Sequence, residues 1–232
     1  LMGGKYEHLE RNTKTMLFSP IVCREVMTAG EMPALLWEFD GRYESMSSAA
    51  VNGGVQSIDW LLNVRVPSDY SRCDLDAHAA EVVTALGLSG VGSTLFTAAD
   101  VRKVQHASIN GVVVDSTVGV TKPTWASDVS SGWGNWQPGT INIVAQMPVA
   151  LTLSAAVNAI ITITEAKTQS LFQHGVPGTG TASDSVVVCW PSSSHREQFC
   201  GPRSQWGSLL AQATFQSIDK GLRAHPRKSA SS

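Results

Sequence analysis

The sequence predicts an α/β or α+β fold: a single domain with a mixed sheet, an N-terminal hairpin and at least three helices. Candidate strands and helices alternate along most of the chain, and no internal repeat or linker separates them. The longest helical pattern, at 152–174, lies centrally between apolar runs at 139–147 and 186–190 that are typical of strands. The early hairpin interrupts a pure βαβ order, so the sheet is expected to be mixed.

Size and composition are those of an ordinary globular protein. The chain has 232 residues, of which 43% are hydrophobic and 16% are charged. This apolar content is sufficient for a sizeable core and argues against a disordered chain. We expect one domain over residues 15–224, a polar leader at 1–14 and a solvated tail at 225–232.

Charge and cysteine usage argue against several classes of function. The net charge of −2 and the pI of about 6.3 give no basic surface for nucleic acid. No run approaches the roughly 20 apolar residues of a membrane span, and residues 1–11 lack a signal peptide's apolar region, so a cytoplasmic location is expected. The four cysteines do not form the Cys-x-x-Cys spacing that is typical of zinc and redox sites. We therefore expect them to be reduced residues that pack against their neighbours; they are Cys23, Cys73, Cys189 and Cys200.

The first part of the chain is expected to be rich in strands. Apolar runs at 16–26 and 33–39 can extend, and Asp40-Gly41 is typical of a hairpin turn that returns as 42–51. Asn52-Gly53-Gly54 then requires a tight turn or a close approach of the backbone to a ligand.

The middle of the chain begins with a helix at 74–86, whose apolar residues share one face. Asp74 can cap its start, and Gly87 follows its end. The remaining segments before the central helix are expected to be strands at 57–66, 90–98 and 111–121 and a helical turn at 100–106.

Residues 121–138 form a loop that holds Trp125, Trp133 and Trp136. Tryptophans seldom stay on a surface without a partner. Two interpretations stay open: a lid over a large flat ligand, or a loop pinned to the core by its own aromatic rings.

The central helical pattern carries two charges on different faces. At 100° per residue, Lys167 falls within the apolar arc, about 200° from Glu165, so the two should not enter one pocket. Lys167 either reaches water along the core edge or is buried with a carboxylate. Glu165 fits acid–base chemistry and equally a solvated face. The apolar stripe contains Leu153, Val157, Ile160, Thr164 and Leu171, and the polar stripe contains Asn158, Thr162, Glu165 and Gln169.

A glycine-rich segment, Gly178-Thr179-Gly180-Thr181, precedes the strand at 186–190. It lacks the ending and the strand–loop–helix order of a P-loop or a dinucleotide fingerprint. Its backbone N–H groups could still approach a ligand oxygen. Asp184 is placed to orient a base or a lysine, and a last helix is expected at 204–222.

Six short segments follow one another in order along residues 35–220. They are Ser47–Gly54, Thr97–Arg102, Gly139–Ile143, Thr164–Lys167, Gly178–Thr181 leading to Asp184, and Gly201-Pro202-Arg203 with Gly207. Together these segments resemble the adenosylcobinamide amidohydrolase (CbiZ) family. One of them departs from the family's Gly-Thr-Gly-Thr-Asp form, because Ala182 and Ser183 lie between Thr181 and Asp184.

The resemblance implies a hydrolase that removes the aminopropanol arm of adenosylcobinamide and leaves adenosylcobyric acid, within cobamide salvage. It implies that Glu165 acts as general base or acid for an attacking water. Asn52, with the N–H groups of Gly53 and Gly54, would stabilise the oxyanion. Lys167 and Asp184 would pair behind the site or act on the leaving amine.

The corrinoid would be the substrate, so neither a cofactor nor a metal is expected. Two alternatives stay open: a non-hydrolytic corrinoid-binding protein, and an amidohydrolase of another amide. No nucleic acid or membrane partner is expected, and a homo-oligomer is compatible with the sequence. The expected substrate-binding residues are Gly53, Gly54, Asn142, Asn158, Thr179, Thr181, Trp125 and Arg203.

Overall fold

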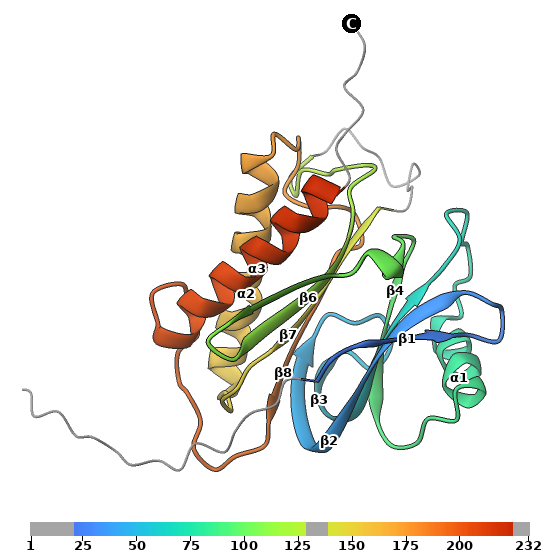
Figure 1. Cartoon of the computed structure of the whole chain (residues 1–232), viewed down its shortest axis with the longest axis horizontal. Coiled ribbons are helices and arrows are strands. Elements are labelled where there is room, and N and C mark those ends of the chain that lie inside the picture. The colour runs from blue at the N-terminus through green and yellow to red at the C-terminus, as the bar shows by residue number, and fades with distance from the viewer. Residues whose placement is uncertain (1–20, 129–138, 225–232) are drawn as a thin grey trace, which may run out of the picture.

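The computed structural model describes residues 21–128 and 139–224 (Figure 1). Its strands form one eight-stranded mixed sheet in the order β4-β3-β2-β8-β7-β6-β5, with β1 paired to β2. The mixed sheet and the long central helix, of 21 residues, confirm the predicted fold class. The elements are β1 (Arg24–Met27), β2 (Pro33–Ser47), β3 (Gly54–Arg65), α1 (Leu75–Ala85), β4 (Gly92–Thr97), the 3₁₀ turn η1 (Val101–Lys103), β5 (Gln105–Ile109), β6 (Val112–Gly119), β7 (Thr140–Gln146), α2 (Leu153–Gln173), β8 (Ser185–Pro191) and α3 (Gln205–Ala224).

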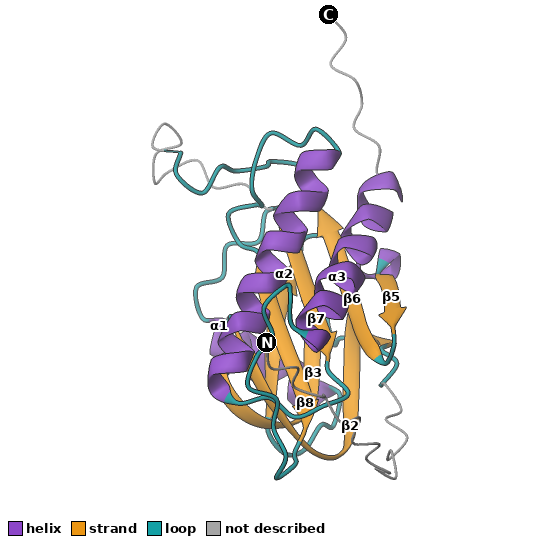
Figure 2. Cartoon of the chain, turned by 90° about the vertical axis from the view of Figure 1, so that its left-hand side faces the viewer, coloured by secondary structure: helices purple, strands orange, loops and turns teal. Residues whose placement is uncertain are grey.

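The sheet bends at β2, so that β1–β4 lie across one face of β5–β8. Helices α2 and α3 lie side by side over the other face of β5–β8, and α1 covers the outer side of β1–β4 (Figures 1 and 2). Side chains of β7 alternate accordingly: Ile143 packs towards the helices, and Val144 packs with Leu35 and Trp37. We call the side of β5–β8 that faces β1–β4 the inner face.

The prediction of a hairpin turn at Asp40-Gly41 is wrong. β2 continues through both residues, and only its register with β3 shifts, between Glu38 and Tyr43. Gly41 has a φ of 101°, which accommodates an irregularity inside one strand. The chain reverses instead at 48–53, where β2 leads into β3, its antiparallel partner.

The predicted helices are confirmed, but Asp74 does not cap α1 with its side chain. Its carboxylate accepts hydrogen bonds from Arg72 instead. Thr152 does cap α2, because its hydroxyl accepts from the backbone N–H of Ala155 at 3.2 Å.

The apolar stripe expected to bury α2 is wrong in orientation for its first half. Leu153 and Val157 are 53% and 47% exposed, whereas Ala155 and Ala159 are fully buried. Alanines leave room for the helix to approach its neighbours closely, so side-chain size decided the orientation more than side-chain polarity.

A β-hairpin joins β5 and β6, where only a helical turn and one strand were expected. Asn110 and Gly111 both have positive φ values, 47° and 86°, as a two-residue hairpin turn requires. This hairpin sets Ile109 opposite Val112 and therefore His106 opposite Asp115.

Asp219 joins the C-terminal ends of α2 and α3. It accepts from His174 Nε2 at 2.7 Å and from Arg223 Nε at 2.9 Å, and these hydrogen bonds, the first above all, lower the pKa of Asp219. A lowered carboxyl pKa stabilises the fold above the unfolded value, about 4, and this contribution is lost as the pH falls through the folded value.

We therefore expect Asp219→Asn to reduce the free energy of unfolding by about 1–2 kcal/mol at pH 7 and by less near pH 3. Urea unfolding at both pH values checks this. Asp69→Asn is the control, because Asp69 is exposed and should change stability little at either pH. An equal loss for Asp219→Asn at pH 7 and pH 3 would contradict the electrostatic cause.

Some expectations concern other parts of the chain. The polar leader at 1–14, the tail at 225–232, Trp133 and Trp136 lie outside the described residues. Within the described ranges, no helix has the length and apolar character needed to cross a membrane.

Candidate functional site

Residues from four of the six short segments come together where β7 and β8 begin. Asp184, directly before β8, lies at the centre of this group. We call it the Asp184 cluster and define it by Ser48, Asn142, Lys167, Thr181 and Asp184.

The carboxylate of Asp184 accepts four hydrogen bonds. Its Oδ2 accepts from Lys167 Nζ at 2.5 Å and from Thr181 N at 3.1 Å. Its Oδ1 accepts from Thr181 Oγ1 at 2.5 Å and from Ile141 N at 3.0 Å. An ionised carboxylate has about four acceptor positions, so this one is saturated. Asp184 therefore holds α2, β7 and the glycine-rich turn together.

Lys167 is buried with a carboxylate, which is one of the two environments expected for it. The side chains of Lys167 and Asp184 are only 8% and 11% exposed. Gly180 permits this close pair, because a Cβ there would lie 2.6 Å from Lys167 Nζ and closer still to the Asp184 carboxylate. Gly180, the second glycine of the Gly-Thr-Gly-Thr segment, thus leaves the space that the buried ion pair occupies.

Ser48 connects the Ser47–Gly54 loop to the start of β8. Its N–H donates to Val186 O at 2.9 Å, and its hydroxyl accepts from Val186 N at 3.0 Å. Ser185 Oγ also donates to Ser48 O at 3.2 Å. The loop is therefore fixed directly beside Asp184.

Asn52, which is exposed, and Gly53, which is half-buried, form the bend of this loop. Asn52 has a φ of 52°, its Nδ2 donates to Gly92 O at 3.0 Å, and its carbonyl accepts from Ser93 Oγ at 2.7 Å. A Cβ at Gly53 would lie 2.5 Å from Ala49 O. The backbone N–H of Gly53 donates to no acceptor among the described residues, so it is free to bind an external oxygen.

Asn142 lies on the inner face of the sheet and ties the two parts of the sheet together. Its Nδ2 donates to Asn63 Oδ1 at 2.8 Å and to Phe96 O at 3.0 Å, and Asn63 Nδ2 donates to Thr117 Oγ1 at 3.1 Å. Asn142 is only 2% exposed, and its Oδ1 is buried without a hydrogen-bond partner in the described structure. Phe96 directly precedes the Thr97–Arg102 segment, so this segment begins beside Asn142.

The loop of Trp125 lies against the glycine-rich turn. Thr124 N donates to Gly180 O, and Thr179 N donates to Thr124 O, both at 2.9 Å. Ala126 N donates to Thr179 Oγ1 at 3.1 Å. Trp125 itself is 49% exposed, so its ring is not pinned in the core and is available to a ligand beside the Asp184 cluster.

The side chains of Glu165, Asn158 and Arg203 form no hydrogen bond or ion pair with the Asp184 cluster in the described structure. Glu165 is exposed and has no hydrogen bond or ion pair to another described residue, which separates it from Lys167 as the helical angle predicted. Asn158 is half-buried on α2. Arg203 is exposed before α3, in a segment that α2 anchors through Thr162 Oγ1 and Cys200 O.

The buried thiols are not set up as nucleophiles. Burial is the main cause that raises the pKa of Cys23 and of Cys200 to about 12, and it raises the pKa of Cys189 as well. These thiols are protonated near neutral pH, and the thiolate is the reactive form. Among residues 21–128 and 139–224, no three His, Cys, Asp or Glu side chains group as metal ligands would.

One histidine–carboxylate pair was not expected from the sequence. His106 Nδ1 lies 2.8 Å from Asp115 Oδ1, across the β5–β6 hairpin. The signal was Asn110-Gly111, because a two-residue turn there places His106 and Asp115 opposite each other.

Comparison with known proteins identifies the family to which the chain belongs. The sequence signature of the CbiZ family, described as adenosylcobinamide amidohydrolase, matches residues 20–230. A protein of that name from Methanosarcina mazei is 26% identical over 191 residues, which cover 78% of this chain and 91% of the relative. Another from Halobacterium salinarum is 26% identical over 192 residues, covering 77% and 82%. An uncharacterised protein of Methanocaldococcus jannaschii is 33% identical over 92 residues, 36% of each chain. Since the signature covers most of the sequence, the chain belongs to the CbiZ family of adenosylcobinamide amidohydrolases, which hydrolyse a carbon–nitrogen amide bond.

Proposed function

We propose that the protein hydrolyses the amide between aminopropanol and the corrinoid of adenosylcobinamide, releasing adenosylcobyric acid, beside the Asp184 cluster. The observation that carries this proposal is the joining of four family segments around one saturated carboxylate, next to an exposed tryptophan. Trp125 offers an apolar ring of the kind that packs against a large flat ligand.

The Ser47–Gly54 loop suits the carbonyl of the scissile amide. A tetrahedral intermediate places negative charge on that oxygen, and backbone N–H donors stabilise it. Gly53 supplies a free N–H, and Asn52 keeps one Nδ2 hydrogen besides the one bound by Gly92 O. We assign the oxyanion-binding role to these two residues.

Lys167 and Asp184 are assigned a positioning role. The Lys167 ammonium is buried against Asp184, and the carboxylate has no free acceptor position for a water. The pair fixes the glycine-rich turn relative to β7, and this turn in turn carries the Trp125 loop.

Glu165 faces solvent, on the opposite side of α2 from Lys167, so we expect Glu165→Gln to keep the turnover of the unaltered protein within a few-fold. Its stability should change by less than about 0.5 kcal/mol. Steady-state kinetics with adenosylcobinamide, together with thermal unfolding, checks both. A loss of turnover of about a hundredfold or more at unchanged stability would place Glu165 in the mechanism.

Asn52→Gly tests the proposed site, because glycine retains the left-handed backbone and removes only the carboxamide. Removal of one oxyanion donor should lower kcat by about a hundredfold, and loss of the Asn52 bond to Gly92 O should lower stability by only about 1 kcal/mol. Chromatography with mass spectrometry measures adenosylcobyric acid and aminopropanol. Asn110→Gly is the matched control, since Asn110 has a similar φ of 47° in the remote β5–β6 turn.

The outcomes separate the site from the activity. Binding of adenosylcobinamide to the unaltered protein without release of aminopropanol would refute the proposed reaction. Equal turnover by the Asn52→Gly and Asn110→Gly variants would refute the role of Asn52 and leave the reaction standing.

A further inference from the structure

We propose that His106 is the general base that activates the attacking water, and that Asp115 orients it. This assignment rests on the proposed amide hydrolysis and adds the catalytic group that the Asp184 cluster lacks. Water is too weak a nucleophile towards an amide unless a base removes its proton.

The pair has the geometry of a base and its orienting carboxylate. His106 Nδ1 lies 2.8 Å from Asp115 Oδ1, and the two side chains are 56% and 3% exposed. A carboxylate can only accept, so the hydrogen lies on Nδ1 and the lone pair of the neutral ring lies on Nε2. The buried oxygen thus selects the tautomer whose free nitrogen can accept a proton.

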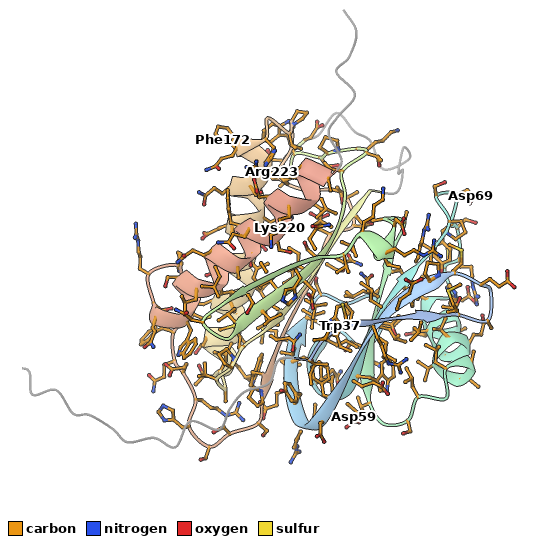
Figure 3. All side chains as sticks on the ribbon, viewed as in Figure 1. Trp37, Asp59, Asp69, Phe172, Lys220 and Arg223 are labelled. Atoms are coloured by element: carbon orange, nitrogen blue, oxygen red, sulfur yellow. The ribbon has the colours of Figure 1, made fainter. Side chains whose placement is uncertain are left out.

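Asp115 is itself held in place from the core. Its second oxygen, Oδ2, accepts from Trp37 Nε1 at 2.9 Å, and Trp37 is 1% exposed. Figure 3 shows Trp37 in the middle of the molecule, between the α2–α3 side and the α1 side. The carboxylate is therefore fixed at both oxygens, and the His106 ring is positioned by a group that cannot rotate away.

The backbone of His106 is fixed as well. Lys220 Nζ of α3 donates to His106 O at 2.7 Å, and Ser217 Oγ donates to Gln105 O at 3.0 Å. Figure 3 shows Lys220 on α3. A base on a rigid strand keeps its alignment better than one on a loop.

The pair belongs to the same surface of the sheet as the network of Asn142. Asp115 and Thr117 are alternate residues of β6, and Thr117 is paired with Asn142 on β7. Two residues along a strand span about 6.6 Å, so Asp115 lies one row from that network. His106 on β5 lies opposite Asp115, so it continues the row of Asp115 to the edge of the sheet.

The other histidines of the described residues differ from His106 in their partners. His78 Nδ1 is bonded to Tyr70 OH at 2.7 Å, and burial is the main cause that lowers its pKa. His174 also pairs with a carboxylate, Asp219, but this pair joins α2 and α3, which cover the face of β5–β8 opposite the inner face. The saturated Asp184, the solvent-facing Glu165 and the protonated buried thiols do not fit the role either. His195 is exposed and forms no side-chain hydrogen bond with a described residue.

The chemical step balances without a further reactant. Nε2 takes one proton from water while the water oxygen bonds to the amide carbon, and the carbonyl electron pair moves onto its oxygen. As that pair returns, the carbon–nitrogen bond breaks, and the Nε2 proton passes to the leaving nitrogen. The products are a carboxylic acid and the free amine.

His106→Ala tests the assignment, because the side chain is largely exposed and its removal should leave the fold intact. We expect kcat to fall by about 10²–10⁴-fold, with a similar KM and a small fall in melting temperature, because Asp115 Oδ1 loses its hydrogen bond. Added imidazole should restore part of the lost kcat in a saturable manner. His195→Ala, the control, should retain full turnover and show no response to imidazole.

Asp115→Asn is the second variant, and it should lower kcat more than it raises KM. Unchanged turnover in His106→Ala, or a loss that imidazole does not restore, would overturn the assignment. If the unaltered protein releases no aminopropanol, the proposed function fails first. If it does release aminopropanol and His106→Ala does so equally fast, only the base assignment fails.

Discussion

Replacement of Lys167 by methionine should lower the free energy of unfolding by about 3–5 kcal/mol, the usual cost of an uncompensated buried charge. Methionine fills a similar volume but removes the ammonium 2.5 Å from Asp184 Oδ2. The carboxylate keeps its bonds to Thr181 and Ile141, yet it stays only 11% exposed without a counter-charge.

Urea unfolding measures this effect, and two further variants sharpen it. The double variant Lys167→Met with Asp184→Asn should recover much of the loss, because no charge then remains buried. Arg24→Met should cost at most about 1 kcal/mol, since Arg24 and Glu38 form a pair at 58% and 53% exposure. Equal losses for Lys167→Met and Arg24→Met would contradict the buried pair.

Gly53→Ala should lower kcat by about 10²–10³-fold, the range seen when an oxyanion donor is displaced. The new Cβ would lie 2.5 Å from Ala49 O and 3.3 Å from Ala49 N, both backbone atoms of the same loop. The loop must then shift, and the Gly53 N–H moves with it.

Steady-state kinetics and thermal unfolding together test this prediction. Gly201→Ala is the matched control, because a Cβ there meets no atom within 4 Å, and it should preserve turnover. Unaltered turnover in Gly53→Ala would show that the shape of this loop does not matter to the reaction.

Local sequence patterns predicted the individual elements well. Apolar runs and Gly87 after the first helix fixed most boundaries to within a few residues. The bend of the sheet was not predictable, because Asp40-Gly41 can serve either as a hairpin turn or as an irregularity inside one strand. The neighbouring strands decide between them, and these pairings join residues far apart in the chain.

The candidate site was predicted in part. The helical angle separated Glu165 from Lys167, and the structure confirms that separation. Asp184 was expected to orient a base or a lysine, and it binds Lys167. The helical angle did not predict which face of α2 is buried, because the buried face carries alanines, whose hydrophobicity is too weak to mark it in the sequence.

The His106–Asp115 pair shows what single-residue inspection misses. Neither residue belongs to one of the six segments, and only the register of the Asn110-Gly111 hairpin places them opposite each other. The contact of Asp115 with Trp37, 78 residues away in sequence, depends on the bend of the sheet and carries no local signal.

The most direct measurement is hydrolysis of adenosylcobinamide in water enriched in oxygen-18, followed by mass spectrometry of both products. We predict that the unaltered protein places one heavy oxygen in the new carboxyl group of adenosylcobyric acid and releases an equal amount of aminopropanol. We predict the same products, formed far more slowly, from Asn52→Gly. Recovery of unchanged corrinoid, or a carboxyl group without heavy oxygen, would contradict hydrolysis at this site.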